Sequence, residues 1–165
     1  MPAKVALAQR QACLQLTQVA TVTQFGRPAS MRRLGMGAWM TSAAIALFAL
    51  LLVKHFICDF VLQSKWQVHQ KGIYGAPGGL VHSAIHVAGT LVALIAVMTP
   101  ISLIVPVLIA EYVIHYHIDW GKEQVVRAFD WREGARFWNA IGFDQLLHGL
   151  TYLAIVAYVI GHIAG

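Results

Sequence analysis

Long apolar runs, each broken by a few polar positions, set the pattern of this chain. Four runs approach the roughly 20 residues that an α-helix needs to cross a bilayer: residues 38–63, 79–98, 101–120 and 143–161. The chain is 58% hydrophobic and 12% charged, whereas soluble domains are about 25% charged. The pattern therefore predicts an all-α integral membrane protein, built as an antiparallel bundle of four transmembrane helices.

The segments between the runs predict the connections. The Thr99-Pro100 link is short and uncharged, so the helices on either side should run antiparallel. Residues 64–78 contain several glycines and a proline, from which we expect a loop without helix. Residues 122–138 mix arginines with large aromatics, which is typical of a short interfacial helix between the third and fourth membrane helices. Pro106 should kink the third helix or end a half-helix.

The first 37 residues have a different composition. They contain five basic residues and no Asp or Glu, which fits a targeting segment, a disordered or interfacial tail, or an upstream start of translation. We favour a tail without a role in the core. The predicted organisation is thus a basic extension over residues 1–37 and a four-helix membrane domain over residues 38–165.

Each predicted membrane helix carries one pair of His or Asp residues spaced four apart, whereas random scatter would give roughly one such pair in the chain. On a helix this spacing places both side chains on one face. The pairs lie at the ends of the first and third helices and at the starts of the second and fourth, so an up-down bundle brings them to one side of the membrane. We call these eight residues the His/Asp cluster: His55/Asp59, His82/His86, His115/Asp119 and Asp144/His148.

Imidazoles and carboxylates in a half-buried pocket form the donor set of a metal site. A divalent transition metal is the expected cofactor, with zinc the first choice. Asp59, Asp119 and Asp144 are the candidate catalytic residues, since a metal lowers the pKa of bound water toward about 7 and a carboxylate can accept the proton. The predicted metal ligands are His55, His82, His86, His115 and His148.

Three polar neighbours are candidates for orienting a substrate, namely Gln63, Gln145 and Lys122. Glu111 shares the face of the third helix but lies one turn deeper, so we do not include it among the ligands. The remaining histidines are interpreted as loop, interfacial or helix-end residues: His69, His117 and His162.

The order of these motifs resembles that of one family over about residues 51–158. It consists of small bacterial and phage integral membrane proteins of the domain-of-unknown-function 3307 type, and it implies no established activity. A looser similarity is to small membrane proteins described as metal-dependent hydrolases, through their His/Asp-bearing helices. The motifs that carry the resemblance are His55-Phe-x-x-Asp59-Phe-x-Leu-Gln63, His82-x-x-x-His86, His115-x-x-x-Asp119-x-x-Lys122 and Asp144-Gln145-x-x-His148.

Three functions stay open. The favoured one is a metal-dependent hydrolase that acts on a lipid or lipid-linked substrate, because basic loops suit phosphate headgroups. The second is a structural or phage-related interaction protein in which the cluster is a polar lock between helices. The third is a metal or proton transporter, which needs polar groups along a whole path through the bilayer. The apolar far halves of the second and fourth helices argue against that third function.

The net charge and the positions of the basic residues bear on the binding partner and on the orientation in the membrane. The net charge of +5 does not indicate nucleic acid, because no basic strand interleaved with aromatics and no zinc-finger spacing occurs. The expected partner is the lipid bilayer, and the sequence sets no oligomeric state. Six Lys and Arg lie in the two loops beside the cluster and five precede the first membrane helix. Since the positive-inside rule applies best to short loops, we expect a multi-pass protein of the bacterial inner membrane with the cluster facing the cytoplasm.

Overall fold

The described part of the chain is entirely helical. This computed structural model describes the backbone of residues 29–164 and the side chains from residue 35 onward, and it contains no strand in that range. Four helices are long and apolar enough to cross a membrane, which confirms the predicted fold class. Residues 1–28 of the predicted N-terminal extension lie outside the described residues. The elements are α2 (Ala29–Phe56), the π-helix η1 (Ile57–Val61), α3 (Lys65–Gln70), α4 (Pro77–Ala96), α5 (Ile101–Ala128) and α6 (Gly134–Ala164).

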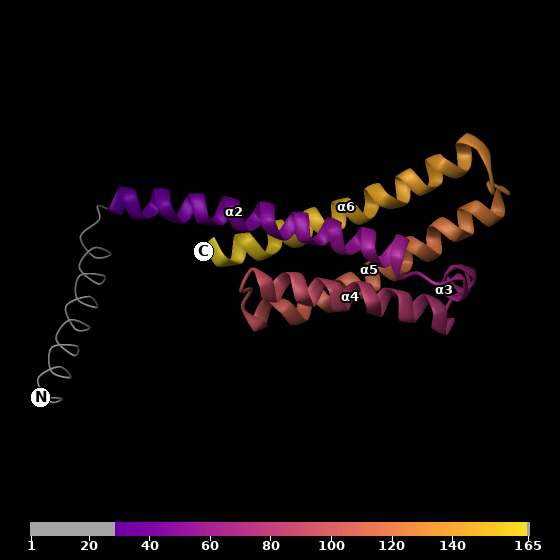
Figure 1. Cartoon of the computed structure of the whole chain (residues 1–165), viewed down its shortest axis with the longest axis horizontal. Coiled ribbons are helices and arrows are strands. Elements are labelled where there is room, and N and C mark those ends of the chain that lie inside the picture. The colour runs from indigo at the N-terminus through magenta and orange to yellow at the C-terminus, as the bar shows by residue number, and fades with distance from the viewer. Residues whose placement is uncertain (1–28, 165) are drawn as a thin grey trace, which may run out of the picture. The chain divides into compact units, whose positions relative to one another are not determined.

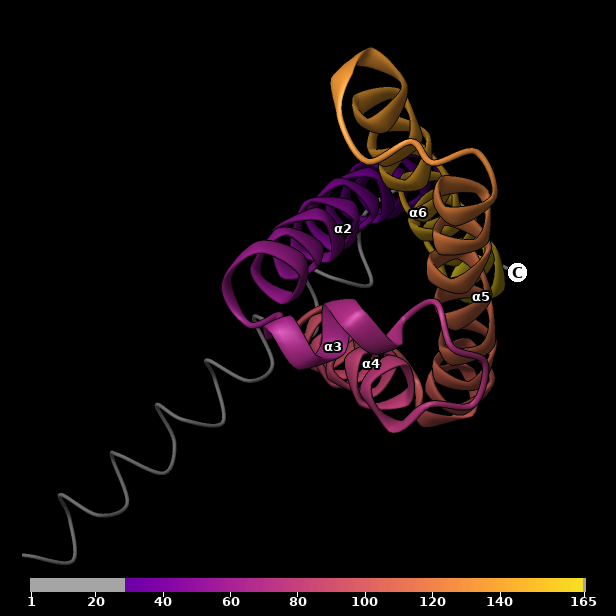
Figure 2. The ribbon, with the colours of Figure 1, turned by 90° about the vertical axis from the view of Figure 1, so that its right-hand side faces the viewer.

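Residues 40–165 form one compact unit, in which α5 packs between α4 and α6 (Figures 1 and 2). Helix α4 runs antiparallel to α5 and α6 returns along α5 (Figure 1), and the short helix α3 lies against α4 (Figure 2). An apolar core begins where the His/Asp cluster ends. Leu47 and Leu51 of α2 precede His55, whereas Ala93 and Leu94 of α4 follow His86.

The α4–α5 link confirms the predicted tight turn. Pro77 occupies the first turn of α4, where its missing N–H leaves no hydrogen bond unmade. The helix ends in a Schellman motif: Thr99 N donates to Leu94 O at 2.9 Å and Met98 N to Ile95 O at 2.9 Å. Met98 takes the left-handed conformation that this motif requires, with φ of 56°. Pro100 then precedes the first residue of α5.

The segment predicted as a helix-free loop, residues 64–78, contains α3. Ser64 Oγ accepts a hydrogen bond from Gln67 N at 3.3 Å, and Ser64 N donates to Gln67 Oε1 at 2.7 Å. This reciprocal pair is a capping box, which satisfies two backbone donors that a helix start would otherwise leave free. The prediction was wrong because the glycines and the proline all come after α3.

No separate interfacial helix lies between α5 and α6 in the described chain. Helix α5 continues to Ala128, and its end is another Schellman motif, in which Trp131 N donates to Val126 O at 3.0 Å. Asp130 and Gly134 have φ values of 50° and 72°, and they turn the chain directly into α6. The amphipathic composition of residues 122–138 thus belongs to two helix ends and a short loop. Helix α5 also continues through Pro106 without ending there.

Candidate metal centre

The structure brings the four predicted pairs into one cluster inside the bundle. Every side chain of the His/Asp cluster is at most 7% exposed. The imidazole rings of His86 and His115 have centroids 3.9 Å apart, and those of His115 and His148 are 4.3 Å apart. His55 lies 4.9 Å from His148 by the same measure. Side chains from all four membrane-length helices therefore converge on one small volume.

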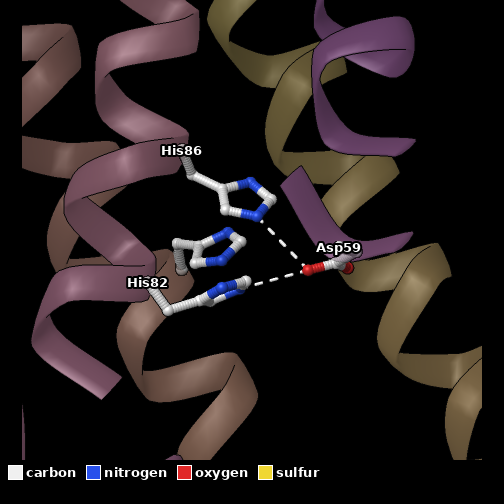
Figure 3. Close-up of side chains that lie close together, drawn as sticks. Asp59, His82 and His86 are labelled. Carbon is white, nitrogen blue, oxygen red and sulfur yellow. Dashed lines mark hydrogen bonds and ion pairs between the residues drawn. The ribbon is translucent and has the colours of Figure 1, made fainter. Parts of the chain in front are cut away.

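Asp59 enters this volume from a local irregularity at the end of α2. The helix widens to the π-form over Ile57–Val61, where Leu62 N donates to Ile57 O at 2.9 Å. Such π-turns are often found at functional sites, because they change the direction of side chains along a helix. Asp59 Oδ1 lies 3.1 Å from His82 Nε2 and 3.2 Å from His86 Nε2, both on α4 (Figure 3).

The second oxygen of Asp59 faces the other helices. Its Oδ2 lies 3.2 Å from His55 Nε2 and accepts a hydrogen bond from Gln145 Nε2 at 3.3 Å. His55 is held in turn through Nδ1, which lies 2.9 Å from the Tyr152 hydroxyl oxygen. Gln63 Nε2 donates to the backbone carbonyl of Asp59 at 3.3 Å. Both predicted orienting glutamines therefore contact the same carboxylate residue.

Asp119 forms a second carboxylate centre on α5. Its Oδ2 lies 3.3 Å from His82 Nε2 and 3.4 Å from His115 Nε2. The Lys71 ammonium lies 3.0 Å from the same oxygen and 3.7 Å from Asp59 Oδ1. Lys71 was missed from the sequence, because it follows α3 in a segment predicted to be an open loop, yet it is only 4% exposed.

The loop after α3 is tied to α5, which explains how Lys71 reaches the cluster. Gly72 O accepts hydrogen bonds from Gln124 Nε2 at 2.9 Å and from Arg127 Nη1 at 3.1 Å. The Tyr116 hydroxyl accepts one from Gly75 N at 2.6 Å. These contacts hold the residues directly after Lys71 against the helix that carries Asp119.

Several buried donor and acceptor atoms of the cluster have no hydrogen bond. They include His82 Nε2, His115 Nε2, His148 Nε2 and both carboxylate oxygens of Asp119. Some of these atoms lie close to an oppositely charged group, as His82 Nε2 does to Asp59. That contact is short, but it does not have the geometry of an N–H···O hydrogen bond. A buried polar atom without a partner is costly, so His148 Nε2 and Asp119 Oδ1, which have no ion-pair contact either, point to a missing ligand.

The donor atoms have spacings that suit a small cation. Four ligands bound at 2.0–2.1 Å in tetrahedral geometry lie about 3.3 Å from one another. The four distances from Asp59 Oδ1 and Asp119 Oδ2 to histidine Nε2 atoms fall between 3.1 and 3.4 Å. The donors fall into two sets that share His115, and within each set all ligand atoms lie within 4.8 Å of one another. The sets are Asp59, His82, His86 and His115, and His115, Asp119 and His148.

His148 shows which of its nitrogens is free. Its Nδ1 lies 2.9 Å from the backbone carbonyl of Asp144, and a carbonyl can only accept, so Nδ1 carries the proton. In the neutral imidazole, Nε2 is then the unprotonated nitrogen, and it is the atom without a partner. A ring whose other nitrogen donates to a carbonyl is the usual arrangement of a metal-bound histidine.

Asp144 and Lys122 lie at the border of the cluster. Asp144 Oδ1 is buried without a hydrogen bond, and the side chain lines a cavity between α5 and α6 together with Lys122. The Lys122 ammonium pairs with Glu123 Oε1 at 3.1 Å. The structure thus places Lys122 beside this cavity rather than among the histidines.

Glu111, one helical turn before His115 on α5, belongs to a separate ion pair outside the His/Asp cluster. Its carboxylate is bonded to the Lys54 ammonium, which also donates to His86 O at 3.2 Å. The sequence carried a signal for this pair, because a lysine inside an apolar run is costly and requires a partner. The other histidines lie outside the cluster on exposed positions: His69, His117 and His162.

Comparison with known proteins identifies a family without an assigned activity. Residues 47–164 match the family model described as "Protein of unknown function (DUF3307)". This match confirms the resemblance seen in the motifs. No curated protein and no solved structure matches the chain.

Proposed function

Because this chain belongs to the DUF3307 family, whose function is unknown, we propose a function from the site itself. The protein is a multi-pass membrane protein whose His/Asp cluster binds a divalent transition metal, with zinc the first choice, and it hydrolyses a lipid or lipid-linked substrate. One observation carries the proposal: imidazole nitrogens and carboxylate oxygens from four helices converge in a buried volume, and several of them have no hydrogen-bond partner.

The donor chemistry fits zinc better than a hard cation. Most of the candidate donors are imidazoles, which suit zinc, copper, iron and nickel, whereas magnesium and calcium prefer oxygen ligands. His82, His86 and His115 with Asp59 form the more complete donor set. His148 of α6 and Asp119 of α5 form a second donor set with His115, which belongs to both sets.

A bound metal would supply a Lewis acid and water of lowered pKa. Residues of the chain would then position the ligands and accept the proton from the water. Asp59 holds the imidazole of His86 in place through Oδ1 and lies beside that of His82, from the opposite side of the cluster (Figure 3). Asp144 is the best placed of the three predicted catalytic carboxylates to act as general base, because its Oδ1 has no hydrogen bond and its side chain lines an open cavity.

Substitution with Co²⁺ tests the metal site. Ligand-field absorption of Co²⁺ in the visible range reports its coordination, so titration of detergent-purified protein should produce the intense bands of a tetrahedral nitrogen and oxygen site. His82→Ala/His86→Ala should abolish these bands, because it removes two ligands of the fuller donor set. His162→Ala is the matched control, since His162 is exposed and its Nδ1 donates to the backbone carbonyl of Tyr158. Equal spectra for both variants would refute the site.

One observation favours a second candidate function, the polar lock. The Lys71 ammonium already lies against Asp119 and Asp59, so it offsets part of the negative charge that a metal would neutralise. Lys71→Met separates the two functions. If the cluster binds a metal, removal of a nearby positive charge should raise the affinity by about tenfold or more. If the cluster is a lock, no metal should bind, and unfolding should become easier by about 3–5 kcal/mol.

A further inference from the structure

A long groove follows the interface between α5 and α6 and ends beside the His/Asp cluster. It is made of two adjoining cavities of about 650 and 620 Å³. The cavities share three apolar lining residues, Ile114, Ile118 and Leu147. Together the two cavities form a groove along the two helices, which we call the α5–α6 groove.

The groove is long enough for a lipid chain. Its lining on α5 extends from Pro106 to Val125, and at 1.5 Å per residue this distance is about 28 Å. That length approaches the thickness of the hydrocarbon core of a bilayer, roughly 30 Å. Because both helices have the length and composition of membrane spans, we expect an opening between them to face lipid tails rather than water.

Polar groups are unevenly distributed along the groove. The end near the cluster is lined by Lys122, Asn139 and Asp144, with Trp131 beside them. The other end is lined mainly by aliphatic side chains, and the exceptions include Glu111, whose carboxylate is bonded to Lys54. Trp is favoured at the level of the headgroups, so the polar end has the composition of the membrane interface. An occupant with an apolar chain and one polar head matches this distribution.

We propose that the α5–α6 groove binds a lipid that carries a phosphate in its headgroup, with the acyl chain along Ile114, Ile118 and Leu147 and the phosphate at Lys122. This inference rests on the proposed function, because it names the substrate class of the same site. The Lys122 ammonium, which has further N–H donors besides its contact with Glu123 Oε1 at 3.1 Å, and the Asn139 amide are donors for phosphate oxygens. Asp144 belongs both to the groove lining and to the cluster, so the headgroup would lie directly beside the donor atoms.

Binding of a lipid that cannot be cleaved tests the groove. The probe is the phosphonate analogue of dioleoyl phosphatidic acid, added to the full chain in detergent and measured by native mass spectrometry. Dioleoylglycerol has the same chains without the phosphate, and inorganic phosphate has no chain. The metal content of each sample is measured in parallel. We expect the phosphonate lipid to bind more tightly than either comparison compound.

Paired substitutions locate the binding. Ala154→Trp fills the groove from an exposed position on α6, whereas Ala157 is exposed on the same helix outside the groove. Ala154→Trp should weaken binding by about tenfold or more, and Ala157→Trp should leave it unchanged. Ala110→Trp blocks the groove from α5 and replaces Ala154→Trp if that variant does not fold. Lys122→Gln should weaken binding of the phosphonate lipid by about tenfold, the scale of one charge-assisted hydrogen bond, and leave dioleoylglycerol unchanged.

The outcomes separate the groove from the metal site. Lipid binding in the groove is refuted if Ala154→Trp and Ala157→Trp have equal effects, or if all three compounds bind equally. Either result refutes it even when the protein contains metal. Groove-dependent binding in samples that hold no metal even after reloading with zinc supports the groove and refutes the metal-dependent hydrolase.

Discussion

Removal of one partner from the ion pair between Lys54 and Glu111 should cost several kcal/mol, because the charge left behind is buried. Lys54 is 8% exposed and Glu111 is 1% exposed. Removal of one partner of a buried pair leaves an uncompensated charge and typically costs about 3–5 kcal/mol. An exposed pair contributes only about 0–1 kcal/mol. We therefore expect Glu111→Gln to lower the free energy of unfolding by about 3–5 kcal/mol.

Replacement of both partners should cost much less than the sum of the single changes. Lys54→Met/Glu111→Met removes both charges and keeps apolar volume at both positions, an exchange that is often neutral or stabilising. The Lys54 ammonium also donates to His86 O, but a backbone carbonyl is an acceptor that can stay unpaired more cheaply than a charge. A double-mutant cycle isolates the coupling between the two side chains.

Unfolding in mixed micelles, followed by circular dichroism, measures these free energies. The chain offers a matched control in Lys122 and Glu123, whose side chains are 18% and 20% exposed and whose charged atoms lie 3.1 Å apart. Because these side chains are partly exposed and solvent screens their charges, Glu123→Gln should cost clearly less than Glu111→Gln. The reasoning is refuted if Glu111→Gln costs no more than Glu123→Gln, or if the effects of the single changes at Lys54 and Glu111 simply add.

Three further predictions follow from particular side chains. Asp144→Asn should abolish hydrolysis of a phosphate-bearing lipid while metal content is retained, and full activity of this variant would exclude Asp144 as general base. Gly72→Val should loosen the loop after α3 and increase its cleavage in limited proteolysis, because a Cβ at Gly72 would lie 2.3 Å from the Arg127 guanidinium carbon and would displace the side chain that donates to Gly72 O. Gly121→Ala should not change the cleavage, since a Cβ there meets no atom within 4 Å. For orientation, Arg132→Cys in a chain with its two cysteines replaced by serine should be protected in intact cells from a membrane-impermeant maleimide, and labelling from outside would contradict a cytoplasmic-facing cluster.

The membrane fold could be predicted from the sequence because hydrophobic length alone decides it. Four apolar runs leave few ways to satisfy backbone hydrogen bonds other than spanning helices. The start of α3 was also readable, since Ser64 and Gln67 have the spacing of a capping box. The predicted interfacial helix was wrong for a different reason. Composition over residues 122–138 reports amphipathic character but does not show where the left-handed residue Asp130 ends one helix.

The cluster itself was predictable in part. Spacing at four residues puts His115 and Asp119 on one face of a helix, and the alternation of chain direction brings the four helix ends together. The position of Lys71 was not predictable in this way, because it depends on hydrogen bonds from α5 to the Gly72 carbonyl. The π-turn at Asp59 was likewise hidden, since no residue type in Ile57–Val61 requires it.

Elemental analysis of the purified protein tests the central claim most directly. Protein purified in detergent without added metal, and again after reloading with zinc, is compared with His82→Ala/His86→Ala prepared in the same way. The account predicts a stoichiometric transition metal in the wild-type protein and its loss in the double variant. A wild-type protein that holds no metal even after reloading would contradict the account, and it would leave the His/Asp cluster as a polar lock.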